Sequence, residues 1–461
     1  MIFKKKITVF SLIMLNVIAV DSLRSIPFAA KYGFSLVFFY LIGALCFFIP
    51  TALVSAELST GWPEQGGIYI WTKKAFGKKW GMIAIWIQWV YNIVWFPVIL
   101  SLISTTIAYI INPSLIYNKN FIAFMVLFIF SGTTILNSYG IYASYRLTNI
   151  SAILGSIFPI IIIAIIGSMW IYDGKPSQIK FDWNHFFPHI SSIGSLVLLT
   201  NVLFSLVGIE MSSIHIKDVE NPKKSYPKAL FWSSFIILIT LIGGSLSIAV
   251  VLPKDKIELL SGMLQILDAF CSSYHIKYIK YIIPICIILG GIGSISAWIL
   301  GPSKGIMVSS KDGIIPKFLS KCNKYNAPVG VLRVQFLIFL FIWSIYWFMP
   351  NVSSSFWILS NITAILSFIP YIFIFLSIIF LRYKFPNIKR AYKIPGGILG
   401  VSIISFLGII TCLITIIIGF IPPDGIDYGS LWRYELILCF GIFILLIIPF
   451  VYNFIKIRIK V

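Results

Sequence analysis

The chain has 461 residues, of which 59% are hydrophobic and only 11% are charged. This composition excludes a water-soluble globular protein and is typical of a protein that crosses a membrane many times. The formal net charge of +21 at pH 7 is compatible with nucleic-acid binding, but the basic residues form short clusters between apolar segments. That distribution is the one that marks cytoplasmic loops, so we expect no nucleic-acid partner.

Twelve apolar segments predict membrane-spanning helices. They lie near 7–30, 35–57, 80–111, 120–139, 147–172, 191–216, 227–252, 277–305, 332–350, 355–381, 397–421 and 433–455. An even number of spans places both termini on the same side, and most of the 36 Lys and Arg residues face the cytoplasm when that side is cytoplasmic. The basic start of the chain precedes a poor cleavage site, so we interpret it as an uncleaved first helix. The predicted fold class is an all-α polytopic membrane protein.

Two of these segments are interrupted by polar or helix-breaking residues. In the first, Asp21, Ser22 and Arg24 fall in mid-span, and Pro27 prevents a continuous helix. In the sixth, helical character is lost at 205–208. Breaks five helices apart are expected for two inverted repeats of five helices each. In such repeats, the ends of the half-helices face an anionic substrate group near the middle of the membrane.

Glu210 follows the second break and lies in sequence that is still apolar. A carboxylate at that depth costs several kcal/mol unless it is protonated, paired or beside a water-filled cavity. The alternative is that Glu210 reaches the interface from a helix end, but its side chain is short and a glycine-broken turn precedes it. We therefore predict a functional role for Glu210.

The third and eighth spans carry further polar and aromatic residues. Gln88, Tyr91, Asn92 and Trp95 share one face of the third helix. Such side chains hold helices together as readily as they bind a ligand, and both alternatives stay open. Trp298, in the eighth span, either caps a cavity or packs at the lipid interface.

Weaker signals concern single residues and absent motifs. We expect Lys304 to extend to the interface and His215 to be an interfacial histidine rather than a pH sensor. The six cysteines are scattered, which indicates neither a disulfide framework nor a metal site. The sequence contains no phosphate-binding glycine loop, nucleophile triad or ligand cluster, so we expect no enzymatic activity, no metal and no cofactor.

Three groups of residues resemble the signatures of a known family. Ala56-Glu57-Leu58, with Gly61-Trp62-Pro63 and Gly66-Gly67-Ile68-Tyr69, is similar to the second helix and the loop after it. Phe204 to Glu210 followed by Glu220-Asn221-Pro222 resembles the sixth helix, and Lys311-Asp312-Gly313 with Pro316 resembles the loop after the eighth. On these motifs the chain is identified as a member of the amino acid–polyamine–organocation (APC) superfamily, with the likeness extending over about residues 7–395.

The resemblance implies a LeuT-like fold of five plus five helices with two additional helices at the C-terminus. Residues 1–172 then form the first inverted repeat with helices 1–5, and residues 191–381 form the second with helices 6–10. Residues 397–461 hold the two additional helices and the C-terminal tail.

The family's functional positions carry over to individual residues of this chain. Phe204 stands at the position of an aromatic gate over the substrate, and Glu210 stands at that of a carboxylate implicated in proton-dependent coupling. Asn92, Ser294, Trp298 and Thr363 match substrate-lining or gating positions on helices three, eight and ten. Ser22, Ser205 and Gly208, at the two breaks, are further candidates for contact with the substrate's backbone groups. Tyr371 also matches a family tyrosine.

The first break departs from the family's usual Gly-Ser-Gly, because Val20-Asp21-Ser22 stands there. The glutamate:γ-aminobutyrate antiporter branch also lacks those glycines, and the run 32–39 is similar to that branch. Asp21 is a candidate for the substrate's ammonium group, and Arg24 for a carboxylate, which a guanidinium binds through two parallel hydrogen bonds. In the alternative, Asp21 and Arg24 pair with each other or with Glu210.

These observations predict a secondary amino-acid transporter that works by alternating access. An exchanger of the glutamate and γ-aminobutyrate type in a bacterial cytoplasmic membrane, with both termini inside, fits the resemblance best. The alternative is a proton- or ion-coupled symporter of a neutral amino acid or polyamine. A transport-inactive sensor and a channel are less well supported, because long soluble tails and a pore-like ring of charge are missing. The expected partners are the amino acid and the lipid bilayer; no oligomeric state is predicted.

Overall fold

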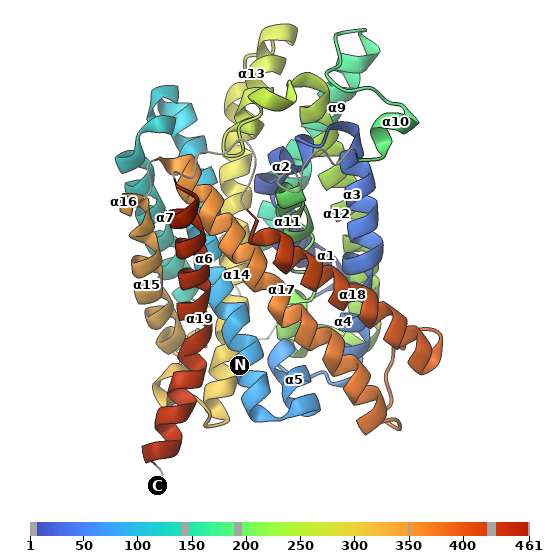
Figure 1. The fold of residues 1–461 in the computed structure, drawn as a ribbon, viewed down its shortest axis with the longest axis vertical. Helices are drawn as coiled ribbons and strands as arrows, with labels where there is room; N and C mark the ends of the chain where they lie inside the picture. The colour runs from blue at the N-terminus through green and yellow to red at the C-terminus, as the bar shows by residue number, and fades with distance from the viewer. Residues whose placement is uncertain (1–6, 140–146, 189–195, 349–350, 422–429, 460–461) are drawn as a thin grey trace.

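The computed structural model describes residues 7–139, 147–188, 196–348, 351–421 and 430–459. Within these ranges the chain is a bundle of helices (Figure 1), with one isolated β-bridge between Ile7 and Val219 and no β-strand. The predicted all-α fold class is confirmed.

Eleven helical segments are long and apolar enough to cross a membrane. They are Val9–Ala30, Gly33–Gly61, Lys78–Ile111, Lys119–Ser138, Leu147–Tyr172, Pro222–Val251, Ile279–Lys311, Val329–Phe348, Val352–Lys384, Gly397–Gly419 and Tyr434–Tyr452. The sixth predicted span is missing from this set because it consists of two short pieces, and its first residues, 191–195, lie outside the described residues. Counting that interrupted span, the fold has the twelve predicted crossings.

The principal elements of the first half begin with the interrupted first helix. They are α1 (Val9–Val20), α2 (Ile26–Ala30), α3 (Leu36–Gly43), η3 (Ala44–Phe48), α4 (Ile49–Gly61), α5 (Ile68–Phe76), α6 (Lys78–Ile111), α7 (Lys119–Ser138), η5 (Ser151–Ile157), α9 (Phe158–Tyr172) and α10 (Trp183–Phe186). Of these, η3 and η5 are π-helical turns inside longer helices.

The second half begins with the interrupted sixth helix. Its principal elements are α11 (Val197–Phe204), η7 (Met211–Asp218), α12 (Pro222–Val251), α13 (Gly262–Tyr274), α14 (Ile279–Lys311), α15 (Val329–Trp343), α16 (Ile345–Phe348), α17 (Val352–Lys384), α18 (Gly397–Gly419) and α19 (Leu431–Ile459). The division into two repeats and a C-terminal pair stays a prediction.

The first break lies where the polar residues stand. The helix α1 ends at Val20, and Ser22 adopts extended backbone dihedral angles. A short 3₁₀ turn at Leu23–Ser25 then leads into α2. Pro27 lies in the first turn of α2, where its missing N–H would have no helical partner in any case. The proline therefore starts the second half-helix, and the first has already ended at Val20.

The second break follows Phe204, the last residue of α11. Gly208 has φ of +120°, a conformation that residues with a Cβ rarely adopt. A 3₁₀-helical segment, η7, follows from Met211 and carries the chain to Asp218. Glu210 therefore lies in non-helical backbone inside the bundle, so the break extends two residues beyond the predicted 205–208.

The two interrupted helices are joined at one end. The backbone N–H of Ile7 donates to the carbonyl of Asp218 at 2.8 Å, and the N–H of Glu220 donates to the carbonyl of Ile7 at 2.9 Å. These bonds connect the residue before α1 with the end of η7. The start of the first interrupted helix and the end of the second are therefore connected through their backbones.

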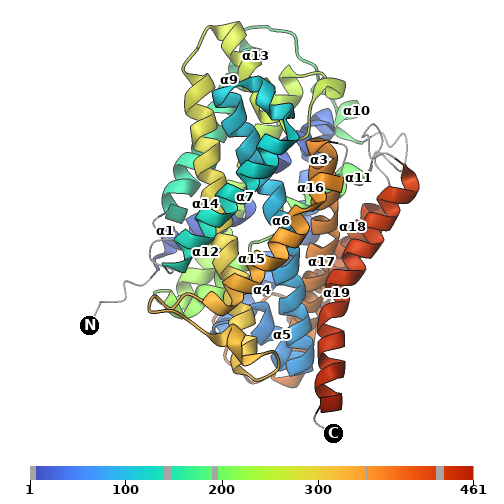
Figure 2. The same ribbon diagram turned by 90° about the vertical axis from the view of Figure 1, so that its left-hand side faces the viewer.

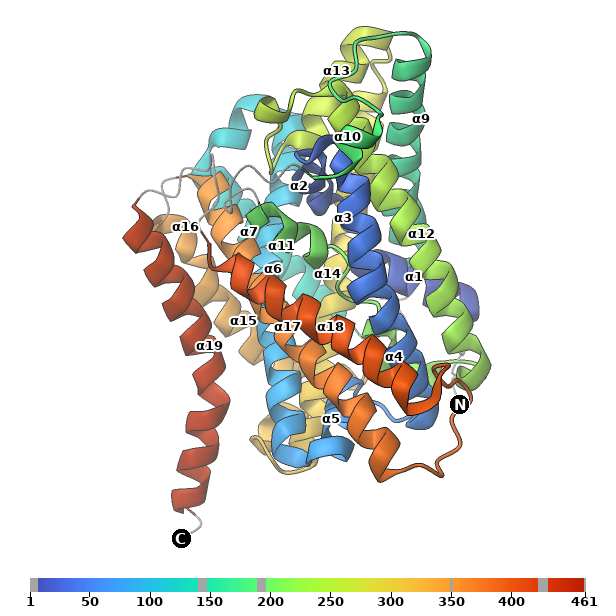
Figure 3. The ribbon, with the colours of Figure 1, turned by 45° about the vertical axis from the view of Figure 1, so that its right-hand side comes forward.

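The bundle has a buried centre, and many large hydrophobic side chains are exposed on its outer surface. The helix α6 is buried along most of its length, whereas α18 and α19 expose most of theirs, and Figures 2 and 3 show α19 at the edge of the bundle. In the views of the ribbon, α5 lies at the end where α19 terminates, and α13 lies at the opposite end. We call the first of these the α5 end.

Candidate functional site

The two breaks meet at a small cavity in the middle of the bundle. Its volume is about 20 Å³, which is enough for one water molecule and too small for an amino acid. Its walls come from both breaks, from α6 and from α14. The lining residues are Ala19, Val20, Ser22, Arg24, Tyr91, Asn92, Trp95, Phe204, Ser205, Val207 and Trp298.

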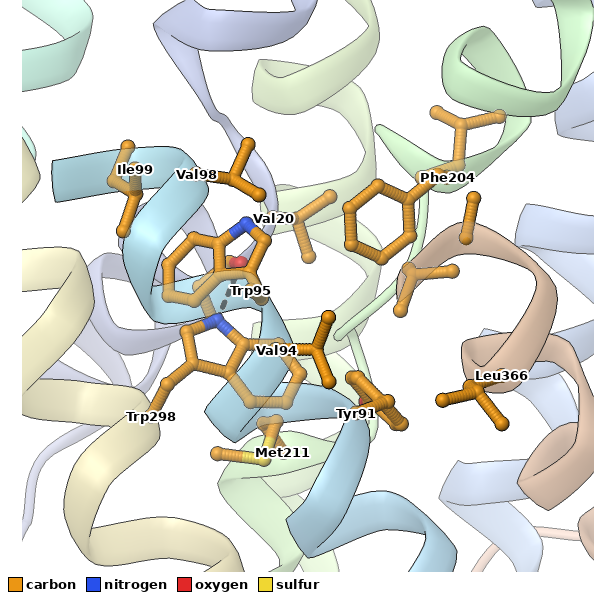
Figure 4. Close-up of a cluster of buried hydrophobic side chains, with 14 of the residues drawn as sticks. Val20, Tyr91, Val94, Trp95, Val98, Ile99, Phe204, Met211, Trp298 and Leu366 are labelled. Carbon is orange, nitrogen blue, oxygen red and sulfur yellow. Dashed lines mark hydrogen bonds between the residues drawn. The ribbon is translucent and has the colours of Figure 1, made fainter. Parts of the chain in front are cut away.

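Aromatic rings form one side of this cavity. Figure 4 shows Tyr91, Trp95, Trp298 and Phe204 gathered around Val20, near the end of α1. The ring centroid of Trp298 lies 6.1 Å from those of both Tyr91 and Trp95. An apolar, aromatic wall excludes water, so polar groups in the cavity act on a ligand in a medium of low dielectric constant.

Trp298 joins the two breaks. Its indole N–H donates to the carbonyl oxygen of Ala19 at 2.9 Å, which satisfies one of the carbonyls left without a partner at the end of α1. The same ring lies against Gly208, where an added Cβ would come within 2.8 Å of the ring and 3.3 Å of the Ala19 oxygen. Glycine is therefore required at 208 both for its positive φ and for this close approach.

Arg24 is buried and lines the cavity with its guanidinium group. One Nη donates to Ser360 of α17 at 2.9 Å, and the guanidinium carbon lies 4.9 Å above the ring of Phe204. Its Nε has no hydrogen-bond partner among the described residues, and none of their ion pairs includes Arg24. The structure therefore shows Arg24 paired with neither Asp21 nor Glu210.

Glu210 lies below the cavity in a chain of hydrogen bonds. One carboxylate oxygen accepts from Tyr371 of α17 at 2.5 Å, and the other accepts from Gln88 of α6 at 3.1 Å. The hydroxyl of Tyr371 also accepts the backbone N–H of Gly208 at 2.8 Å. Tyr371 therefore connects the carboxylate of Glu210 to the glycine of the helix-6 break.

The predicted substrate residues divide into two groups in space. Six of them line the cavity: Ser22, Arg24, Asn92, Phe204, Ser205 and Trp298. The other four do not line it: Asp21, Gly208, Ser294 and Thr363. Of those, Gly208 lies against the ring of Trp298, which lines the cavity. The hydroxyl of Thr363 donates a hydrogen bond to the carbonyl of Leu359 in its own helix at 2.7 Å.

Several lining residues were not among the predicted substrate contacts. Tyr91 and Trp95 lie on the face of the third helix that the sequence singled out. Helical periodicity predicts that the two residues share this face, but it does not distinguish ligand contact from helix packing. Ala19, Val20 and Val207 are apolar and offer no signal in the sequence. They line the cavity because both breaks expose backbone there.

A second group of charges closes the α5 end of the bundle. Glu57 of α4 is fully buried and accepts two hydrogen bonds from Arg382 at 2.5 and 2.7 Å. It also accepts the N–H of Ile394 at 2.8 Å and lies 3.3 Å from the Nε of Arg390. Glu57 therefore ties α4 to the end of α17 and to the chain that follows it.

A neighbouring pair connects α5 to the end of α14. Asp312 accepts hydrogen bonds from Lys73 and Tyr69, both of α5. Partial burial by itself would raise the pKa of Asp312, but these two hydrogen bonds hold the pKa below its usual value. Asp312 is therefore ionised throughout the physiological pH range.

Lys304 is buried, which corrects the expectation that its side chain extends to the interface. Only 2% of it is exposed, and its ammonium nitrogen lies 3.2 Å from Nδ1 of His215 and 3.8 Å from the carboxylate of Asp218. Neighbouring polar groups on η7 hold the lysine inside the bundle. His215 is likewise buried and is not an interfacial histidine.

Comparison with known proteins adds an independent line of evidence. The family described as amino acid permease matches residues 7–445. An uncharacterized transporter of Legionella pneumophila is 43% identical over 449 residues, which cover 97% of each chain. A glutamate/gamma-aminobutyrate antiporter of Lactococcus lactis is 29% identical over 454 residues, covering 97% of this chain and 90% of its own. A probable agmatine/putrescine antiporter of that species is 24% identical over 433 residues, with 91% and 89% covered.

Proposed function

The chain belongs to the amino acid permease family, and on this basis we propose that it exchanges amino acids of the glutamate and γ-aminobutyrate type by alternating access. The similarity to the glutamate/gamma-aminobutyrate antiporter of Lactococcus lactis supports this substrate class. The proposed location is the bacterial cytoplasmic membrane. The α5 end, which carries the basic residues Lys73 and Lys74, then faces the cytoplasm together with both termini.

The observation that carries the proposal is the guanidinium group of Arg24 in the cavity. It has one hydrogen bond, to Ser360, and no carboxylate partner among the described residues. A buried guanidinium without a counter-charge is costly, and a substrate carboxylate would supply that charge with two well-directed hydrogen bonds. Ser22 and Tyr91 add two hydroxyl groups, both lining the cavity and both unpartnered.

The backbone ends at the breaks suit the two charges of an amino acid. The first N–H groups of α2 form the positive end of a half-helix, and the last carbonyls of α1 form the negative end of another. The carbonyl of Ala19 is held by Trp298 through a single hydrogen bond. We infer that the substrate's ammonium group competes with the indole for this end of α1.

The cavity must enlarge before an amino acid enters, because its volume is that of one water molecule. Phe204 and Trp298 both line the cavity, and each belongs to or touches the helix-6 break. We infer that these rings move during the cycle. Phe204 then acts as the gate over the substrate.

Glu210 is proposed as the group whose protonation is coupled to this movement. When its carboxylate is ionised, Tyr371 donates to it and accepts the N–H of Gly208. A protonated carboxyl no longer requires that donor, which releases Tyr371 to rotate and removes the partner of the Gly208 N–H. The protonation state of Glu210 therefore changes the hydrogen bonding of the Gly208 backbone at the break.

The alternative of a polyamine substrate fits the cavity less well, although a probable agmatine/putrescine antiporter is among the relatives. A polyamine carries two or more positive charges, and Arg24 would repel it in a medium of low dielectric constant. A symporter of a neutral amino acid remains the alternative mechanism, and the next experiment distinguishes it from exchange.

The test measures uptake of radiolabelled glutamate into proteoliposomes that contain glutamate, γ-aminobutyrate or no amino acid. Exchange predicts uptake only into the loaded vesicles. Equal uptake into empty vesicles under a proton gradient would show symport instead. Absence of uptake under all three conditions, with binding of other amino acids, would contradict the proposed substrate class.

The Arg24→Ala variant tests the residue that carries the proposal. We expect the apparent affinity for glutamate to fall at least about tenfold more than that for a neutral amino acid, because a hydrogen bond to a charged group contributes about 1.5–3 kcal/mol. The exposed Arg333, on α15, supplies the matched control Arg333→Ala, which should change neither value. An equal loss for acidic and neutral substrates would assign Arg24 a structural role.

A further inference from the structure

A second cavity, larger than the substrate cavity, lies between α19 and the rest of the bundle. Its volume is about 370 Å³, and its walls come from α6, α15, α16, α17 and α19. We call it the apolar pocket. Each of these elements belongs to a helical segment that is long and apolar enough to cross a membrane. Figure 3 shows α19 at the outer edge of the bundle, with α15 and α16 beside it.

Two hydrogen bonds hold α19 at either end of the apolar pocket. The side-chain amide of Asn361, on α17, donates to the hydroxyl of Tyr434 at 2.8 Å. The indole N–H of Trp86, on α6, donates to the carbonyl of Leu445 at 3.1 Å. Residues 437–445 of α19, which lie between these two attachment points and include the second, line the pocket. The pocket is therefore held open by contacts of α19 with two other helices.

The walls of the apolar pocket offer no partner to a polar ligand. Twelve of the thirteen described residues that line it are hydrophobic residues or glycine. The remaining one, Ser344, donates its hydroxyl proton to the carbonyl of Phe341 at 2.6 Å. An apolar cavity of this kind excludes water and binds apolar molecules, and benzene already binds in a cavity of about 150 Å³. The ligand that suits these walls is therefore a hydrocarbon.

The apolar pocket opens toward the outside of the bundle. Phe341, Phe348 and Phe440 line it and are 69%, 78% and 59% exposed. Because these residues lie on membrane-crossing segments, the medium outside the opening is the hydrocarbon interior of the bilayer. Acyl chains of phospholipids fill that interior. If a methylene group takes about the volume of a water molecule, ~30 Å³, the pocket accommodates roughly twelve of them, the larger part of one acyl chain.

We propose that the apolar pocket binds one acyl chain of a bilayer phospholipid at a defined position between α6, α15, α17 and α19. Lipid tails are as apolar as the pocket walls, so moving a chain from the bilayer into the pocket gains nothing from the hydrophobic effect. The chain gains dispersion contacts instead, because helices surround it on several sides. A lipid on the convex surface of the bundle contacts the protein on one side only.

The apolar pocket lies beside the substrate cavity, with α6 and α17 between them. On α6, Val94 lines the apolar pocket, whereas the next residue, Trp95, lines the substrate cavity. On α17, Leu359 lines the apolar pocket, whereas the next residue, Ser360, accepts the hydrogen bond from Arg24. A bound chain therefore packs against the two helices that carry these substrate-site residues. Lipid binding does not rest on the proposed exchange function.

The test uses the purified full-length protein in detergent and a phosphatidylethanolamine that carries a photoreactive diazirine group on one acyl chain. After irradiation, mass spectrometry of peptides identifies the labelled residues. We expect labelling of 341–348, on α15 and α16, to saturate as the lipid is added and to be displaced by unlabelled phosphatidylethanolamine. The exposed residues Phe124 and Phe128 of α7 report on lipid at the surface, and their labelling should rise without saturation.

The Gly441→Leu variant tests the apolar pocket itself. Gly441 lines the pocket, and an added Cβ would meet only Ile362, at 3.4 Å, which is an ordinary contact distance. The leucine side chain therefore takes up pocket volume, and we expect the saturable labelling of 341–348 to fall several-fold. Gly132, on the exposed side of α7, has no atom within 4 Å of an added Cβ. The matched control Gly132→Leu should keep the wild-type labelling.

Labelling of 341–348 that rises without saturation, as on α7, would overturn the proposal and show surface lipid only. Unchanged saturable labelling in Gly441→Leu would also overturn it. Displacement by free oleic acid but not by phosphatidylethanolamine would assign the pocket to a free fatty acid instead. If Gly441→Leu does not fold, Ile444→Trp provides the decision, because it fills the pocket from the same helix and should reduce the labelling in the same way. Since no substrate is present, failure here leaves the exchange experiment unaffected.

Discussion

Asp21 and Glu57 are two buried carboxylates in the same bundle with opposite surroundings. Glu57, at the α5 end, accepts two hydrogen bonds from Arg382 and one from the backbone of Ile394. Asp21, at the break after α1, has no such partner among the described residues. Both carboxylates have lost their hydration, yet only Glu57 has received a full replacement from the protein.

The difference separates a charge that the described side chains compensate from one that they do not. Glu57 joins α4 to the far end of α17, so its role is to hold one end of the bundle together. Asp21 and Arg24 lie only three residues apart at the break after α1 and do not form an ion pair with each other. In the proposed function, the guanidinium of Arg24 then binds a substrate carboxylate.

The largest effect is expected for Glu57→Gln. Removing one member of a buried ion pair leaves Arg382 uncompensated and costs about 3–5 kcal/mol, so the variant should melt at a much lower temperature in detergent. Glu64 forms an exposed pair with Lys74 at 3.2 Å, and the control Glu64→Gln should cost at most about 1 kcal/mol. If the Glu57→Gln protein is stable but no longer transports, Glu57 takes part in the transport cycle. That result would contradict the structural role assigned to it here.

An intermediate effect is expected for Glu210→Gln. The carboxylate of Glu210 has hydrogen-bond partners, unlike that of Asp21, but these partners are neutral, unlike the arginine that pairs with Glu57. We expect the variant to insert normally and to exchange about tenfold more slowly at the pH optimum, the loss that about 1.4 kcal/mol would produce. Its pH profile, measured in proteoliposomes, should be flat. A profile identical to that of the wild type would remove Glu210 from coupling.

The smallest effect is expected for Asp312→Asn at the α5 end. The pair with Lys73 is partly exposed and contributes about 0–1 kcal/mol to stability, so the melting temperature in detergent should fall by at most a few degrees. The pKa of Asp312 is held below its usual value, so its contribution is complete above the unfolded-state pKa and is lost only as the pH falls through the lower, folded-state value. Between pH 5 and about 8 the variant should keep the wild-type pH dependence, and a flattened profile would contradict this assignment.

Local sequence determined the crossings and the positions of both breaks. Runs of apolar residues long enough to cross a membrane predict helices by length alone. Polar residues and Pro27 mark the first break at 21–27, and Gly208 marks the second at 205–208. The importance of Glu210 followed from the same reasoning, because burying a carboxylate is costly wherever its partners lie.

Tertiary structure alone decided what each polar side chain contacts. Arg24 binds Ser360, which is 336 residues away, and Glu210 binds Gln88, which is 122 residues away. At the breaks, side-chain direction does not follow helical periodicity, so the sequence left open whether Asp21 and Arg24 face the substrate or each other. Packing turned Arg24 toward the cavity and Asp21 away from it, because the orientation of a side chain on a non-helical segment depends on the helices that surround it.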